Sequence, residues 1–567
     1  MGTAELLVGP LLRHVDATRA TIWVETDRPC RVEVHTEVPG EVPGDDAVSA
    51  TEPTWSVHGH HYALVLLQGL SPGSVTEYRV LLDGEAVWPD PANGFPASVI
   101  RTPGDGDVVR LTFGSCRQSA PLDDAGVRRF GPDALVALAE HLTRTPHPEW
   151  PDLLLLDGDQ IYADEPSDAI RARLRERVRP DPEMAEEIAD FEEYTWLYHE
   201  TWSEPAVRWL LSTVPTVMML DDHDLRDDWN TSLAWREQVT SQIWWRDRVV
   251  GGLGSYWVYQ HLGNLSPEEL DTEPLYHLVR TEPDDAVRTN RLDEFAFEAD
   301  ADPSSARWSM VRDLGDAVRL VVVDTRCSRS LDPDHRAIVD DVEWAWFRDR
   351  VLERRLDHLL IGSTLPVMLP PAIHHLEGWD EAVVGGAWGR HAVRIAEKLR
   401  QLMDLEHWAS FGASLHRLCG LLDEVAGVGR DPAGEPPASV VFLSGDIHSS
   451  YVARASIPGV DPRRTAVVQL TMSPLRNRLG RVMQLATRAL SGRLAALTTH
   501  RVARTAAVQD VPMRWRLDRG VWFANGVMTV VLEGRQARVE VRHAVLVEGR
   551  HVLRPTWQGS LTSGPRP

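Results

Sequence analysis

Six short apolar segments of the chain each end in residues that can do chemistry. The clearest is LLLLDGDQIYADE (residues 153–165), in which four leucines are followed by Asp157, Asp159 and Tyr162. The other five segments end at residues 115–116 (Ser-Cys), 221–224 (Asp-Asp-His-Asp), 324–326 (Asp-Thr-Arg), 362–364 (Gly-Ser-Thr) and 445–448 (Gly-Asp-Ile-His). Carboxylates this dense repel one another unless cations lie among them, and hard divalent or trivalent ions prefer oxygen ligands. We therefore expect a metal site.

Asp159 is the best candidate to bridge two metal ions. The preceding Gly158 permits a tight turn from strand to loop, which would place the aspartate at the strand tip. Two ions about 3.5–4 Å apart would hold a phosphoryl group and activate a water for in-line attack.

The six segments themselves predict strands of an α/β core. They are continuously apolar, which is typical of strands buried on both faces. Helix-like segments such as 133–144 and 340–356 lie between them, and this alternation favours an α/β architecture. Active sites of α/β sheets form at the carboxyl ends of the strands, where all six polar motifs would lie.

The chain divides at about residue 104. Residues 1–104 alternate apolar and polar positions between turn-forming residues, which predicts an N-terminal all-β sandwich of the immunoglobulin or fibronectin type. Residues 105–567 would then form the catalytic domain, with acidic helical insertions at about 163–204 and 265–302. The second insertion is expected to be partly irregular.

Composition narrows the class of protein. The 567 residues carry a formal charge of −25, so general nucleic-acid binding is not expected. No apolar run reaches the roughly 18 residues of a membrane span, and no secretory signal is visible. The four cysteines are widely spaced without a CxxC pair. These features predict a cytoplasmic protein.

Taken together, the motifs resemble the PhoD-like alkaline phosphatase and phosphodiesterase family, a branch of the metallophosphoesterase superfamily related to purple acid phosphatases. The resemblance is carried by GSC, GDQIYAD, DDHD, VDTR and GDIH, and by an L-x-P-G-x-x-x-x-Y-R-V turn at residues 70–80. It implies a metallophosphoesterase-type α/β sandwich core. It also implies hydrolysis of phosphate monoesters, diesters or both by a metal-bound hydroxide at a polynuclear site of iron(III) and calcium, the second metal being the less certain.

The resemblance also assigns roles to individual residues. The implied metal ligands are Cys116, Asp159, Tyr162, Asp222, Asp446 and His448. His223 would stabilise the transition state or protonate the leaving oxygen, and Arg326 would grip phosphate oxygens. His448, placed among the ligands, is also counted with the catalytic residues.

Several alternatives stay open. Cys116 alone could be a buried small hydrophobe, and Asp222 with His223 a structural pair. Arg326 could instead pair with acidic residues. The chain departs from the family at Cys327, which follows Asp-Thr-Arg, and around His374 and His375, which are packing residues or pocket candidates. The substrate could be a small phosphoester or a lipid. A phospholipase D-like enzyme at membrane surfaces, or a catalytically weak phosphate- or metal-binding homologue, are the alternative functions.

One stretch is not explained by these motifs. Residues 462–509 contain nine arginines and no aspartate or glutamate. Within them Leu479, Met483, Ala486, Leu490, Leu494 and Leu497 follow helical spacing, with Arg481 and Arg488 on the opposite side. The favoured interpretation is a helix that packs its apolar side on the core. The alternative is a basic arm that steers anionic substrate or makes peripheral membrane contact through residues 476–504.

Overall fold

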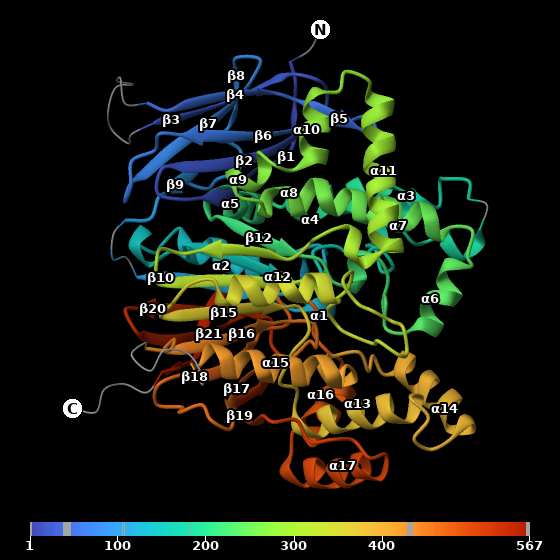
Figure 1. Ribbon diagram of the computed structural model, residues 1–567. Coiled ribbons are helices and arrows are strands. Elements are labelled where there is room, and N and C mark those ends of the chain that lie inside the picture. Colours follow the sequence, from blue (N-terminus) through green and yellow to red (C-terminus); the bar gives the residue numbers. More distant parts are fainter. Residues whose placement is uncertain are drawn as a thin grey trace.

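The computed structural model describes residues 3–37, 47–104, 106, 108–179, 181–427 and 435–562 (Figure 1). The N-terminal part is a pair of antiparallel sheets. One sheet has the order β1 (Leu6–Val15), β2 (Arg19–Thr26), β6 (His60–Gln68), β5 (Trp55–Val57). The other has the order β4 (Ser49–Pro53), β3 (Arg31–Glu37), β7 (Val75–Leu82), β8 (Glu85–Trp88), with β9 (Val99–Arg101) beside β7. Alternate side chains such as Ile22, Val34 and Val80 meet in one apolar cluster between the sheets. The other face of the β1-β2-β6-β5 sheet is also buried, because Trp23 and Tyr62 join the apolar cluster of the remaining chain.

Two further sheets form the core of the remaining chain. The six-stranded sheet has the order β12 (Thr216–Met219), β11 (Leu153–Asp157), β10 (Val109–Gly114), β20 (Gly526–Glu533), β21 (Gln536–Val547), β22 (Arg550–Ser560). The seven-stranded sheet has the order β13 (Met310–Asp313), β14 (Val318–Val323), β15 (His358–Ser363), β16 (Ser439–Ser444), β18 (Ala466–Thr471), β17 (Ser450–Ser456), β19 (Arg514–Trp522). Strands β10 to β12 run parallel, as do β14, β15, β16 and β18.

The two sheets face each other and helices cover their outer faces. Leu153 and Leu155 of β11 belong to the cluster between the sheets, whereas Leu154 and Leu156 belong to the cluster under the helices. The helices on that outer face are α2 (Ala134–Leu142), α4 (Phe191–Trp202), α5 (Pro205–Thr213) and α7 (Trp245–Tyr256). Helices α12 (Asp341–Leu352) and α15 (Gly412–Val425) cover the seven-stranded sheet.

The remaining helices lie around this four-layer core. They are α1 (Asp124–Phe130), α3 (Asp168–Leu174), α6 (Leu233–Thr240), α8 (Leu262–Asn264), α9 (Pro267–Leu270), α10 (Pro274–Thr281), α11 (Asp285–Ala301), α13 (Pro371–Val384), α14 (Arg390–Leu402), α16 (Arg481–Leu490) and α17 (Arg493–Thr505). A π-helical turn, Trp257–His261, joins α7 to α8. Within the described ranges no helix is long and apolar enough to cross a membrane.

The predicted α/β core with an N-terminal all-β unit is confirmed. All six chemistry-bearing segments end core strands, but three belong to each sheet rather than to one common sheet. The insertion at 265–302 is largely helical through α9, α10 and α11. The favoured interpretation of residues 462–509 is wrong, because Leu494 and Leu497 point to solvent at 81% and 60% exposure instead of packing on the core.

A buried carboxylate links the N-terminal sheets to the rest of the chain. Glu25 of β2 is fully buried and lies 3.1 Å from His60 Nδ1, 2.9 Å from His199 Nε2 of α4 and 2.8 Å from the Tyr259 hydroxyl. Burial opposes the charged form, but the two histidines lower the pKa of Glu25. Burial also opposes protonation of His60, yet Glu25 and Glu192 raise its pKa. The cluster is therefore a charged contact between the two parts of the chain.

Replacing this carboxylate should destabilise the protein in a pH-dependent way. The lowered pKa of Glu25 contributes stability above its ordinary value of 4.5, and this contribution is lost as the pH falls. The raised pKa of His60 contributes stability below its ordinary value of 6.5, and this is lost as the pH rises. Glu25→Gln should thus cost about 2–4 kcal/mol between these two values and less on either side. Urea unfolding across the pH range measures this.

Glu33→Gln is the matched control, because Glu33 bonds His35 at 3.1 Å in a more exposed pair of the same domain. It should cost less than about 1 kcal/mol at every pH. If Glu25→Gln lowered the free energy of unfolding equally at every pH, or by no more than Glu33→Gln does, the interpretation of the cluster as a charged contact would be contradicted.

Candidate metal centre

The carboxyl ends of six core strands meet at one place between the two sheets. β10, β11 and β12 deliver Cys116, Asp159 and the Asp221–Asp224 turn, while β14, β15 and β16 deliver Arg326, Thr364 and Asp446. The approach is close: a Cβ atom on Gly445 would lie 2.0 Å from Ser115 Oγ, and one on Gly158 would lie 2.9 Å from Ser115 Cβ. Glycine at position 445 lets the end of β16 approach the end of β10 in the other sheet, and glycine at position 158 lets the ends of β11 and β10 pack closely within one sheet.

Three carboxylates at this meeting point could hold a metal ion. Asp159, Asp221 and Asp222 are buried, and one oxygen of each lies within 4.8 Å of the other two. Asp159 Oδ1 and Asp221 Oδ2 have no hydrogen-bond partner although both are buried. Burial raises the pKa of Asp159 and of Asp221, and neighbouring aspartates raise it further. Buried oxygens without partners are costly, so this donor set fits a cation.

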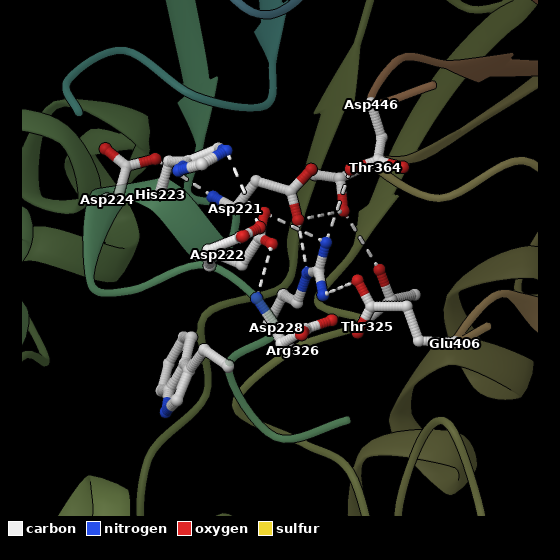
Figure 2. Close-up of polar contacts among 12 residues, drawn as sticks. Asp221, Asp222, His223, Asp224, Asp228, Thr325, Arg326, Thr364, Glu406 and Asp446 are labelled. Atoms are coloured by element: carbon white, nitrogen blue, oxygen red, sulfur yellow. Dashed lines mark hydrogen bonds and ion pairs between the residues drawn. The ribbon is translucent and has the colours of Figure 1, made fainter. Parts of the chain in front are cut away.

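Arg326 is surrounded by carboxylates (Figure 2). Its fully buried guanidinium donates to Asp221 and Glu406, and lies 3.1 Å from Asp222 Oδ1 and 3.3 Å from Asp446 Oδ1. Burial alone would lower its pKa, but the four carboxylates raise it well above the usual value. These contacts match the alternative that the sequence left open, in which Arg326 pairs with acidic residues. A grip on phosphate stays a prediction.

A thiol and a phenol complete one side of the cluster. Cys116 Sγ accepts a hydrogen bond from Ser473 Oγ at 3.3 Å, and its φ of +58° turns the chain sharply after β10. Tyr162 Oη accepts from Asn477 Nδ2 at 3.3 Å. Burial raises the pKa of both groups, and the charge of Asp159 raises both further. A cation beside them would reverse this effect and favour thiolate and phenolate as ligands.

His223 is held by an aspartate that the sequence left unassigned. Its Nδ1 lies 2.9 Å from Asp164 Oδ1, and its ring lies 4.8 Å from that of Tyr162. Despite burial, the charge of His223 lowers the pKa of Asp164 to about 2. Burial likewise opposes protonation of His223, but Asp164 raises its pKa well above the ordinary value. Asp164 therefore orients the imidazole and favours its protonated form.

The turn that carries His223 is braced on both sides. Asp224 Oδ2 accepts from the Asp221 backbone N–H at 3.0 Å, and Asp224 Oδ1 accepts from Gln260 Nε2 at 3.1 Å. Asp222 Oδ2 accepts from the Asp228 N–H at 3.1 Å. These bonds fix where Asp221 and Asp222 point.

Asp446 and His448 are fixed in a similar way. Asp446 Oδ2 lies 3.1 Å from His407 Nε2, and His407 Nδ1 lies 2.8 Å from Glu377 Oε1. His448 Nδ1 lies 2.6 Å from the Asn477 carbonyl oxygen and donates to it. This bond leaves Nε2 of His448 as the nitrogen with a free lone pair, the usual arrangement for a metal-binding imidazole.

The structure thus gathers every site residue predicted from the sequence. These are Cys116, Asp159, Tyr162, Asp222, His223, Arg326, Asp446 and His448. Their individual roles stay predictions. His374 and His375 lie elsewhere: they belong to α13, where the ring of His374 packs against Trp515 and His375 contacts Thr499.

Sequence reasoning missed the residues that support the site from a distance along the chain. Asp221 stands in a motif already noted, so its acidic neighbours could have identified it. Glu377, Glu406 and His407 follow no strand and carry no local pattern. Only the fold brings them to Arg326 and Asp446.

A pocket of about 480 Å³ opens beside this centre. It is lined by Asp164, Asp227 and Asp228 near His223, and farther out by residues that include Glu165, Glu187, Arg226, Trp235 and Trp244. The pocket is therefore acidic, with two tryptophans in its wall.

Comparisons with known proteins agree with this fold. Residues 135–364 match the family model described as PhoD-like phosphatase, and residues 3–100 match a domain of unknown function, DUF7800. A solved structure titled "Structure of PhoD" superposes with a TM-score of 0.60 at 13% identity, covering 100% of this chain and 94% of that one. A maltogenic amylase from S. marinus, at 9% identity over 96% of this chain and 80% of its own, has a TM-score of only 0.12, which is too low to indicate a shared fold. No curated protein matches the chain.

Removing the positive charge of Arg326 from among the carboxylates should destabilise the metal-free protein. Arg326→Gln leaves Asp221, Asp222, Glu406 and Asp446 without their shared partner. In chelator the free energy of unfolding should fall by about 3–5 kcal/mol. Added calcium should restore a large part of this loss, because a bound cation also offsets carboxylate repulsion.

Arg319→Gln provides the control, since Arg319 is also buried and pairs with Asp313 and Glu353, each at 2.7 Å, away from the site. Its unfolding free energy should not respond to calcium beyond the wild-type response. Equal calcium dependence in the two variants, or no loss in Arg326→Gln, would argue against the central role of Arg326.

Proposed function

We propose that this PhoD-like phosphoric ester hydrolase cleaves phosphate monoesters and diesters at a site that holds iron(III) and calcium. The observation that carries the proposal is the convergence of buried aspartates, two of them with unpartnered oxygens, with a thiol and a phenol at the ends of six strands. Such a donor set is unfavourable without cations and suited to them.

The donor types suggest how two ions would be shared. Cys116 and Tyr162 would offer the thiolate and phenolate that iron(III) accepts. Asp159, which influences both of these groups and lies with Asp221 and Asp222, would be the carboxylate shared with the second ion. The oxygens of Asp221, Asp222 and Asp446 would suit the second ion, which we propose is calcium, because calcium takes oxygen ligands. Nε2 of His448 would complete the metal site. When bound, the ions would lower the pKa of a water into the neutral range and withdraw negative charge from the phosphoryl oxygens.

The chain's own residues would then manage protons and orientation. His223, kept protonated and oriented by Asp164, can deliver a proton from Nε2 to the departing alkoxide. Asp164, whose pKa is lowered to about 2, stays ionised and leaves the Nδ1 proton on the ring, so the proton available for transfer is the one on Nε2. The Asp224 bonds to Asp221 N–H and Gln260 keep the turn in place while His223 acts.

The main role of Arg326 would be to position carboxylates, and contact with the substrate would be secondary. Its donors are engaged by Asp221, Asp222, Glu406 and Asp446. Direct contact with phosphate would require it to exchange one of these partners for a substrate oxygen. We propose that its main role is to hold ligands from the two sheets in register.

Hydrolysis of p-nitrophenyl phosphate and bis-p-nitrophenyl phosphate tests the activity. Asp159→Asn should lower kcat at least about 1000-fold on whichever ester is cleaved, because it removes the proposed bridging charge. Comparing the two esters separates monoesterase from diesterase action. Asp300→Asn, which changes a buried aspartate paired with Arg236 outside the site, should keep most of the activity. Equal rates for wild type and Asp159→Asn would leave a metal- or phosphate-binding protein as the better description.

The iron assignment can be tested by colour. Tyrosinate or thiolate bound to iron(III) should give the purified protein a visible charge-transfer band. Tyr162→Phe and Cys116→Ala should each shift or weaken that band, whereas Tyr451→Phe, a buried tyrosine bonded to the Met368 carbonyl oxygen, should leave it unchanged. A colourless, iron-free and active protein would overturn the iron assignment and leave a hydrolase with two other metals.

A further inference from the structure

The two helices α16 and α17 form a hairpin whose large apolar side chains face solvent. Ser491 and Gly492 join the helices. The exposed fractions are 79% for Val482, 66% for Leu485, 81% for Leu494 and 60% for Leu497. A helix that covers a soluble core turns such side chains inward. We call this surface, together with the arginines named below, the hairpin face.

The inward side of the hairpin is made of smaller or polar residues. In α16, Gln484 and Thr487 are partly buried, and in α17 the one buried residue is Ala503. Helix α17 packs against α13 and lies at the end of the molecule away from the N-terminal sheets (Figure 1). The hairpin therefore packs inward through side chains such as Gln484, Thr487 and Ala503, while Leu485, Leu494 and Leu497 remain uncovered.

The hairpin face is also strongly basic. It carries Arg481, Arg488, Arg493, Arg501 and Arg504, in a stretch with no acidic residue, although the whole chain has a charge of −25. In the described part of the chain none of these five arginines forms an ion pair; Arg488 lies over the Phe523 ring at 5.1 Å. At the end of α17, the half-exposed Trp388 donates its indole N–H to the Thr505 carbonyl oxygen at 3.3 Å.

Exposed leucines together with these arginines on one face favour one kind of partner. A second copy of the same face would bring like charges together, and a nucleic acid would use the arginines but leave the leucines in water. An anionic lipid surface satisfies both, because apolar side chains enter the headgroup boundary while arginines contact headgroup phosphates. We propose that the hairpin face docks this enzyme onto anionic lipid surfaces.

The hairpin starts at the wall of the candidate metal centre. Asn477 accepts from His448 Nδ1 and donates to Tyr162 Oη, and α16 begins four residues later at Arg481. Docking through the hairpin would therefore hold the centre close to the surface. The docking inference itself does not depend on the proposed metals or reaction, so a failure of either can be recognised separately.

Vesicle co-sedimentation of the full-length protein tests the proposal. The protein should pellet with vesicles of phosphatidylcholine and phosphatidylglycerol at low salt, and much less at high salt or with phosphatidylcholine alone. Arg481→Gln combined with Arg488→Gln should weaken partitioning about 20-fold. Leu485→Ser combined with Leu497→Ser should weaken it at least about tenfold.

Two exposed substitutions away from the hairpin serve as controls. Val178→Ser and Arg550→Gln should pellet as the wild type does, since both positions are exposed and lie outside α16 and α17. The proposal fails if the wild type does not pellet with anionic vesicles, or if the controls lose as much as the hairpin variants. The proposal also fails if the wild type does not bind vesicles but forms a dimer in sedimentation velocity, and Leu485→Ser combined with Leu497→Ser makes that dimer dissociate. A second copy would then cover the hairpin face.

Discussion

The mutual repulsion of buried carboxylates at the strand ends is the constraint on which this structure depends. Asp221 and Asp222 follow a strand of one sheet, and Asp446 follows a strand of the other, so closing the sheets brings their charges together. Arg326 lies among them with Glu406 and offsets part of that repulsion. A buried arginine of this kind does little for stability by itself, but its loss leaves several charges uncompensated. The same excess of negative charge makes the place suitable for metal ions.

The N-terminal sheets contribute to this site through a continuous chain of contacts. Glu25 bonds the Tyr259 hydroxyl, and the neighbouring Gln260 side chain bonds Asp224. Arg13 of β1 donates to the Gln260 carbonyl oxygen at 2.7 Å and to Asn264 Oδ1 at 3.0 Å. The π-helical turn Trp257–His261 thus lies between the β domain and the turn that presents Asp221 and Asp222. The N-terminal sheets therefore contact the segment whose Gln260 side chain bonds Asp224 in that turn.

Acidic and basic side chains lie on different parts of the molecule. Acidic side chains line the pocket beside His223, whereas the acid-free stretch with nine arginines includes β18, α16, α17 and the loop between β18 and α16. That loop contains Asn477, which contacts both His448 and Tyr162. One short loop therefore connects the wall of the metal centre to the hairpin.

The sequence by itself determined which residues would stand at the strand ends. Continuous apolar runs followed by Asp159, Asp222, Arg326 and Asp446 encode buried strands with polar tips, because local burial and turn chemistry depend on neighbouring residues alone. The apolar runs alone could not assign each strand to one of the two facing sheets of the α/β sandwich that the resemblance implied, since pairing is a long-range choice. Nor could it assign Glu406 and His407, which approach Arg326 and Asp446 only after closure. It also misplaced the leucines of α17, because helical spacing shows that a helix has an apolar side but not whether the rest of the fold covers that side. Tertiary packing decided all three: the sheet of each strand, the approach of Glu406 and His407 to the site, and the exposure of the leucines.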